Sequence, residues 1–193
     1  TPTDPPASGD RTLHRAFYVA QARYLIRKEM LCRLLRAFCS RDIPVLVLKG
    51  MALAHSVYPD PALRAMGDLD LLVKPEDTEK AREILLSLEG IDKPEPQRRI
   101  NPFNTGFTGE QSFYFTELGA PTLVELHWEL FPVEWLRRST RLNVPAMWAR
   151  ATSFQLEDVT VRALAPEDQL VHVCLHLAMH GFTHLRGYLD IVH

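Results

Sequence analysis

The chain has 193 residues, of which 46% are hydrophobic and 24% charged, and its formal net charge is −2. This composition is typical of a globular protein with one sizeable domain, and the slightly negative charge argues against general affinity for nucleic acid. No apolar run approaches the roughly 20 residues of a membrane-spanning helix, so we expect no membrane partner. Three cysteines without paired spacing fit reduced thiols and predict a cytoplasmic protein, namely Cys32, Cys39 and Cys174.

The N-terminal region predicts a flexible tail followed by one long helix. Residues 1–10 are polar and rich in proline, and Asp10 can cap a helix that runs to about Ser40. Apolar residues recur along it at steps of three and four, as in an amphipathic helix. Its other face is rich in arginine, which we interpret as a solvated face, with an anionic partner as the alternative. Residues 11–41 therefore form the expected N-terminal helical segment.

The next region alternates strands and helices. The apolar run over residues 43–48 predicts a buried strand that ends at Lys49 and Gly50, and a short helix follows. GDLDLLV, residues 67–73, predicts a second strand, and a helix can begin at Pro75 and close at Gly90. Glycine, proline and asparagine between residues 91 and 109 predict a long loop, which we interpret as a substrate flap.

The last part of the chain predicts four more strands and a helical end. Strands are expected over residues 112–117 and 122–130, and a hairpin over 153–156 and 159–164. A helix should run from Pro166 to about His180, with another after Gly181 that the end of the sequence interrupts, so we expect part of a longer protein. The predicted fold is α/β (α+β), with a small mixed sheet in a core over residues 42–165. A C-terminal helical lobe, expected to be incomplete, covers residues 166–193.

Two acids in the second strand are the first chemical signal. Alternate side chains of a strand face the same way, so Asp68 and Asp70 project together, roughly 6–7 Å apart. Two buried carboxylates repel and lose hydration unless a cation joins them. A hard divalent metal is the simplest such cation. The alternative is a solvent-facing edge on which both acids stay hydrated.

Three further features surround this pair. Lys49 and Gly50 mark a strand-to-helix turn, where backbone N–H groups can hold phosphate. Glu125 and His127 share a face of a later strand, and a third carboxylate beside the pair would complete a two-metal site. Four histidines recur at steps of four, and an adjacent pair of them could bind zinc: His172, His176, His180 and His184.

Three segments carry a resemblance to a known family. VLVLKGMALAHSVYPDPALRAMGDLDLLV, VELHWEL and LAPEDQLVHVCLHLAMHGF follow one another within roughly residues 35–190. In this order they resemble the bacterial family of uncharacterised nucleotidyltransferases, within the DNA polymerase β-like superfamily. The resemblance implies a nucleotidyltransferase core whose helical lobe walls the nucleotide cleft.

The resemblance also implies roles for particular residues. Asp68, Asp70 and Glu125 take the positions of the catalytic metal ligands. Gly50 takes the glycine turn, while Met51 stands where many superfamily members have a serine for the phosphate, a loss for which Lys49 compensates. Arg64 either reaches a phosphate or holds the acidic strand, and His127 either serves the site or packs in the core. The nucleotide-binding set implied in this way is Lys49, Gly50, Met51, Arg64, His127 and His180.

The implied reaction is transfer of a nucleoside monophosphate from an NTP, most simply ATP, with release of pyrophosphate. Mg²⁺ or Mn²⁺ would be the cofactor. A small molecule, a peptide or a protein is favoured over nucleic acid as the acceptor. Two alternatives remain at this point: a non-catalytic nucleotide- or partner-binding module of the same fold, and a zinc-binding helical protein built on the four histidines.

Overall fold

The computed structural model describes residues 8–92, 109–117, 119–131 and 134–192. Residues 1–7 of the predicted tail and 93–108 of the predicted loop lie outside the described residues. The described part contains a seven-stranded sheet flanked by helices, which confirms the predicted α/β class. Within the described residues, no helix is sufficiently long and apolar to cross a membrane.

The sheet is mixed, with the strand order β3-β4-β5-β2-β1-β7-β6. β2 runs parallel to β5 and β1 runs parallel to β7, whereas the other neighbours are antiparallel. The central strands β1 and β2 are almost wholly buried because both of their faces are covered. The strands span Leu46–Leu48 (β1), Asp68–Leu72 (β2), Ile91–Asp92 (β3), Glu110–Glu117 (β4), Ala120–His127 (β5), Thr152–Leu156 (β6) and Val159–Ala163 (β7).

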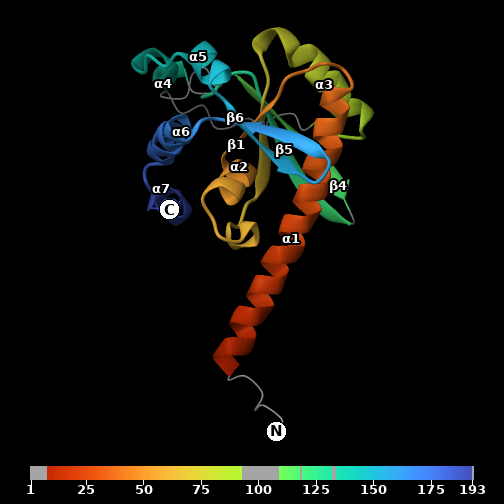
Figure 1. Cartoon of the computed structure of the whole chain (residues 1–193), viewed down its shortest axis with the longest axis vertical. Helices are drawn as coiled ribbons and strands as arrows, with labels where there is room; N and C mark the ends of the chain where they lie inside the picture. The colour runs from red at the N-terminus through yellow and green to blue at the C-terminus, as the bar shows by residue number, and fades with distance from the viewer. Residues whose placement is uncertain (1–7, 93–108, 118, 132–133, 193) are drawn as a thin grey trace.

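Helices lie on both sides of this sheet, with α1 and α3 on one side and α4 to α7 on the other (Figure 1). Short 3₁₀ helices at Pro61–Leu63 and Pro75–Asp77 flank β2. The α-helices span Ser8–Cys39 (α1), Lys49–Ser56 (α2), Thr78–Ser87 (α3), Glu134–Ser139 (α4), Val144–Ala149 (α5), Pro166–Met179 (α6) and Leu185–Val192 (α7).

The alternation of side chains along β1 and β2 divides the interior into two cores. Val47 and Leu71 point into the larger core, beneath α1 and α3. Leu48 and Leu72 point into a smaller core beneath α4, α5 and α6. Asp70 lies two residues from Leu72 and therefore shares the face of β2 that looks toward α6. The position of the acids relative to the helical lobe follows from this alternation.

Helix α1 is much longer than the body it packs against (Figure 1). Its C-terminal part is buried, with Leu31 and Phe38 at 0% and 1% exposure, whereas Leu13 near its start is 70% exposed. Arg36 Nη2 and Nε donate to Asp158 at 2.6 and 3.0 Å, which ties the packed part to the turn between β6 and β7. The predicted long helix is confirmed, although it begins before Asp10.

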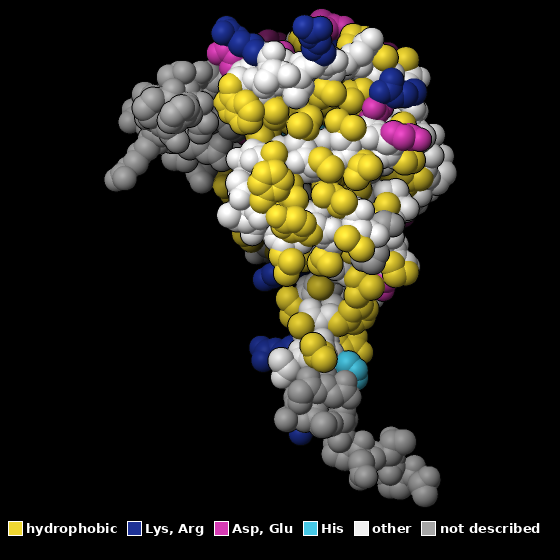
Figure 2. All heavy atoms as spheres, turned by 90° about the vertical axis from the view of Figure 1, so that its left-hand side faces the viewer, with side chains coloured by type: hydrophobic (Ala, Val, Ile, Leu, Met, Phe, Trp, Pro, Cys, Tyr) yellow, Lys and Arg dark blue, Asp and Glu magenta, His cyan; other side chains and the backbone are white. Residues whose placement is uncertain are grey.

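The side of the molecule formed by α6 and α7 is rich in exposed apolar groups. Figure 2 shows hydrophobic side chains gathered on this side. None of the apolar residues of α7 is buried, and the helix reaches α6 at Gly187, where an added Cβ would lie 2.9 Å from Leu177 Cδ1. Exposed apolar residues of the two helices are Leu170, Val171, Leu185, Leu189, Ile191 and Val192.

Several boundaries differ from the sequence predictions. β1 begins at Leu46 rather than at residue 43, because Pro44 cannot donate a hydrogen bond to a central ladder. β5 ends at His127 rather than at residue 130. The pattern missed α4 and α5, which at six residues each are too short for a helical period to emerge. Asn143 caps α5 by accepting from the Ala146 N–H at 3.0 Å.

Candidate active site

A cavity of about 820 Å³ lies between the sheet and the helical lobe. One wall comes from β2, from the last residues of β5 and from the start of α2. The opposite wall comes from α6, α7 and the segment between them. The strand wall includes Lys49, Gly50, Asp68, Asp70, Glu125 and His127, and the helical wall includes His172, His176, His180, His184, Arg186 and Asp190.

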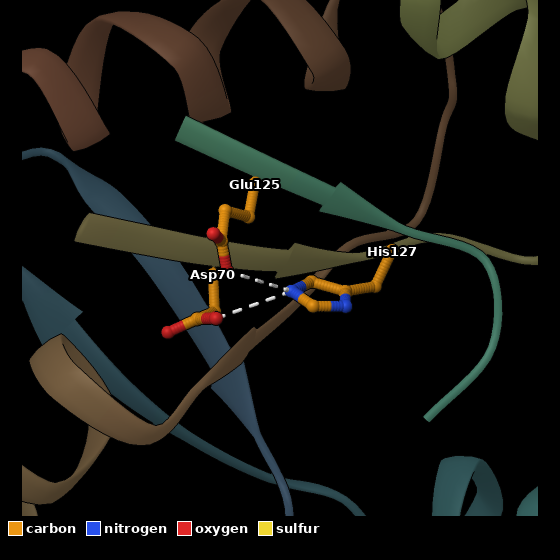
Figure 3. Close-up of side chains that lie close together, drawn as sticks. All are labelled: Asp70, Glu125 and His127. Carbon is orange, nitrogen blue, oxygen red and sulfur yellow. Dashed lines mark hydrogen bonds and ion pairs between the residues drawn. The ribbon is translucent and has the colours of Figure 1, made fainter. Parts of the chain in front are cut away.

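The register of two parallel strands brings the acids together. In the β2–β5 pair, Asp70 lies beside Glu125 and Leu72 lies beside His127. His127 Nε2 donates to Asp70 Oδ1 at 3.1 Å and lies 3.8 Å from Glu125 Oε2. Figure 3 shows these three side chains converging. His127 was assigned to this face from the strand alternation, and its contact with both acids makes it part of the cluster.

Lys49 supplies the positive charge of this cluster. Its Nζ lies 2.7 Å from Asp70 Oδ1, and the two side chains are 14% and 2% exposed. Its main chain has φ +40°, in the left-handed region that a non-glycine residue rarely adopts. The adjacent Gly50 has an ordinary conformation, and a Cβ there would make only van der Waals contacts, the nearest at 3.4 Å from Arg64 Nη1. The left-handed residue of this turn is therefore Lys49, and Gly50 follows it at the start of α2.

The buried charges shift one another's pKa values. Burial would raise the pKa of Asp70, but the Lys49 ammonium and the His127 hydrogen bond hold it below its usual range. Burial and the charges of Asp70 and Glu110 raise the pKa of Glu125 to about 8. Burial and Asp70 also raise the pKa of Asp68. Burial favours a neutral Lys49, yet the carboxylates raise its pKa above the ordinary value. The site therefore holds more acidic groups than its cations neutralise.

This donor set is suited to a divalent cation. Asp70, Glu125 and His127 each offer a ligand atom, and these atoms lie within 4.8 Å of one another. Carboxylate oxygens suit Mg²⁺ and Mn²⁺, and imidazole is a common ligand of transition metals. Asp68, also predicted as a ligand, lines the same cavity but is not one of the three residues whose ligand atoms lie this close together. A cation would also balance the charge that gives Glu125 its high pKa.

Arg64 lies at the cavity with its guanidinium bound to α7. Its Nε donates to Asp190 Oδ1 at 2.9 Å and its Nη2 to Asp190 Oδ2 at 2.7 Å. The Tyr58 hydroxyl donates to the same carboxylate at 2.8 Å. Both ionic side chains are buried, at 6% and 4% exposure. The observed contact joins Arg64 to α7, its contact with a phosphate stays a prediction, and its partner Asp190 has no recognisable signal in the sequence.

The four histidines form a ladder from the interior to the rim. Ring centroids are 6.5 Å apart for His172 and His176, and 4.5 Å apart for each of the next two pairs, down to His184. Burial and the Lys49 charge lower the pKa of His172 well below its usual value, and that of His176 to about 3. Within the described residues, the ladder does not gather three ligand atoms as zinc sites require. His180 lines the cavity, and its contact with a nucleotide stays a prediction.

Two further residues bear on the predicted site: Met51, which belongs to the predicted nucleotide-binding set, and Glu110, which does not. The Met51 side chain is 1% exposed and packs in the larger core, so any contact from Met51 to a nucleotide would come from its main chain. Glu110, at the start of β4, brings Oε2 to 3.2 Å from His127 Nδ1, without the alignment of a hydrogen bond. Sequence reasoning missed Glu110 because it follows a loop and belongs to no motif.

Comparison with known proteins shows the family to which the chain belongs. The model of a family described as uncharacterised nucleotidyltransferase matches residues 2–193. The chain belongs to this family. A search of curated proteins finds no match.

Two solved structures share the fold of this nucleotidyltransferase family member. An antigenic nucleotidyltransferase-like protein from Paracoccidioides brasiliensis is 15% identical with a TM-score of 0.58, over 86% of this chain and 73% of that chain. The lincosamide antibiotic adenylyltransferase LnuA, solved with lincomycin bound, is 13% identical with a TM-score of 0.53, over 84% of this chain and 92% of that chain. At these identities the likeness concerns the fold.

Proposed function

We propose that this chain transfers a nucleoside monophosphate from an NTP, with ATP as the first candidate, to an acceptor nucleophile. The acceptor oxygen forms a bond to the α-phosphorus, the bond from that phosphorus to the bridging oxygen breaks, and pyrophosphate leaves while the acceptor proton passes to solvent. The observation that carries the proposal is the cluster of Asp70, Glu125 and His127 beside Lys49, in a cavity of a nucleotidyltransferase family member.

The residues of the strand wall have two separate proposed roles, namely binding of the metal and binding of the phosphates. Asp70 and Glu125, with Asp68 nearby, would hold Mg²⁺ or Mn²⁺, which lowers the pKa of an acceptor hydroxyl and offsets the charge of the leaving pyrophosphate. Lys49 and the first N–H groups of α2 lie where they can receive phosphate oxygens, and the first turn of α2 carries no acid that would repel them. The helical lobe restricts the access of water to this wall.

The acceptor that fits best is a small molecule or a peptide or protein segment. A cavity of about 820 Å³ lies within the range of small-molecule sites. Its acidic strand wall disfavours a polyanionic acceptor such as nucleic acid. The structure of LnuA was solved with a small molecule, lincomycin. We place the reaction in the cytoplasm, since the three cysteines are free thiols.

The test is to compare NTP affinity and turnover in wild type and in Glu125→Gln. Labelled NTPs would be screened with fractionated cell extract and Mg²⁺ or Mn²⁺ to find an acceptor, and pyrophosphate release would then be measured. Because Gln keeps the size of Glu but loses its charge, NTP should still bind within a few-fold, and turnover should fall by about a thousandfold, or about 4 kcal/mol of transition-state stabilisation.

Glu129→Gln is the matched control. Glu129 follows β5 closely and is not among the residues that line the cavity, so this variant should behave as wild type. Equal loss of affinity and turnover in Glu125→Gln would instead assign Glu125 to binding or folding. No NTP binding and no pyrophosphate release in the wild type, with any extract fraction, would refute the proposed reaction.

A further inference from the structure

The Lys49 ammonium lies beside the carboxylate of Asp70, which is also a proposed metal ligand. Its ammonium lies 2.7 Å from Asp70 Oδ1, the oxygen that also accepts from His127 Nε2 at 3.1 Å. The carboxylate is 2% exposed, so water contributes little to its solvation. Lys49 is therefore the counter-ion that makes burial of the Asp70 carboxylate tolerable.

A metal and this ammonium cannot both hold Asp70 without cost. A divalent cation bound by Asp70, Glu125 and His127 would lie close to the Lys49 ammonium, and like charges inside a buried site repel strongly. Lys49, however, is anchored at the first position of α2, and its side chain is a point charge on a flexible four-carbon stem. It can therefore serve either the carboxylates or a phosphate placed before α2.

We propose that Lys49 couples the two ligands of this site: its ammonium pairs with Asp70 until a polyphosphate draws it away, and only then is the acidic cluster free to bind a divalent cation tightly. The inference rests on the proposed function and adds an order of events to it, in which the polyphosphate prepares the metal site. The left-handed conformation of Lys49 supports it, because such strain persists where the surroundings require a particular placement of the side chain.

The proposed coupling predicts opposite effects of a Lys49 substitution on the binding of polyphosphate and on the binding of the cation. A purely structural role of Lys49 would not produce opposite effects. Removal of the Lys49 charge should weaken binding of polyphosphate, because a charge-assisted contact is lost. The same change should strengthen binding of the cation in the absence of polyphosphate, because a competitor for Asp70 is removed. A residue that only maintained the fold would weaken both ligands when replaced.

The experiment measures Mn²⁺ binding by electron paramagnetic resonance of the free ion, without nucleotide, and tripolyphosphate binding by calorimetry, without metal. Lys49→Met keeps the stem and removes the charge, Lys49→Arg keeps the charge, and Lys74→Met removes an exposed lysine as the control. Lys49→Met should bind Mn²⁺ about tenfold more tightly than wild type and tripolyphosphate about tenfold more weakly. Lys49→Arg and Lys74→Met should remain close to wild type for Mn²⁺.

Unchanged or weaker Mn²⁺ binding by a folded Lys49→Met would overturn the proposal. If this variant fails to fold, the wild type provides the test through the ¹⁵N resonance of Lys49 Nζ, which tripolyphosphate alone should shift as the ammonium leaves Asp70. No shift at saturating tripolyphosphate would equally overturn it. Failure of the wild type to bind tripolyphosphate or NTP would refute the proposed function itself, whereas binding that does not depend on Lys49 would refute the coupling alone.

Discussion

Replacement of Asp190 by alanine tests whether the Arg64–Asp190 ion pair attaches α7 to the rest of the protein. The Arg64–Asp190 pair joins the segment before β2 to α7, with both side chains buried. None of the apolar residues of α7 is buried, so the attachment of this helix depends heavily on the Arg64–Asp190 pair. Breaking a buried ion pair costs about 3–5 kcal/mol, because the remaining charge stays desolvated. We expect about 3 kcal/mol for Asp190→Ala, since α7 can partly lift and admit water to Arg64.

The assay is urea unfolding at neutral pH, supported by thermal unfolding. For a chain of this size, about 3 kcal/mol corresponds to a fall in melting temperature of about 10 °C. The exposed pair of Arg36 with Asp158 is the matched control: it has the same two-pronged geometry, but its side chains are 43% and 63% exposed. Asp158→Ala should change stability much less, because water solvates the remaining guanidinium.

A double variant tests whether the loss of stability comes from the unpaired charge that Asp190→Ala leaves on Arg64. Arg64→Met with Asp190→Leu replaces the pair by apolar groups and should recover most of the stability that Asp190→Ala loses, because no unpaired charge remains. If Asp190→Ala is no more harmful than Asp158→Ala, the buried pair does not secure α7 and this reasoning is refuted.

Two further predictions concern a close backbone contact and an acid response. Gly90→Ala should lower the free energy of unfolding by about 1–3 kcal/mol, because the new Cβ would lie 2.6 Å from the Leu85 carbonyl oxygen. The control is Gly67→Ala, whose Cβ would meet nothing within 4 Å and which should change the free energy of unfolding in urea little. The pKa of His176 is lowered from 6.5 to about 3, so between these values the unfolded chain binds a proton that the folded chain does not, and stability falls as the pH drops from about 6.5. His176→Gln should therefore reduce the loss of stability between pH 7 and pH 5 by about 2 kcal/mol in urea unfolding, and an unchanged loss would contradict the neutral state of this partly buried ring.

The sheet and its acids were predictable because they depend on short-range rules. Alternation along a strand places Asp68 and Asp70 on one face, and it joins Glu125 to His127. Two buried carboxylates on one face repel each other and lose hydration, which predicts a cation beside them, with a metal ion as the first candidate. In the structure the cation beside Asp70 is the ammonium of Lys49, which adjoins Leu48, the cross-strand partner of Asp70.

The helical lobe was less predictable because its contacts join distant parts of the chain. Asp190 meets Arg64 across the cavity, and no local pattern links an acid in one helix to an arginine before a strand. Glu110 reaches His127 through the pairing of β4 with β5, in which the two residues lie opposite each other, whereas the sequence pattern begins this strand only at residue 112. Sequence rules therefore identify the elements that carry chemistry, and tertiary packing decides which of their side chains meet.

The strand order has a consequence for how the protein is made. β1 lies between β2, which follows it closely in the chain, and β7, which follows β5 and two helices. As the chain leaves the ribosome, β1 and β2 can pair early, but one edge of β1 stays open until residues 159–163 emerge. An open apolar edge is prone to association with other chains, so this interval is the vulnerable period of synthesis. The ribosome thus completes the acidic half of the cavity before its histidine half.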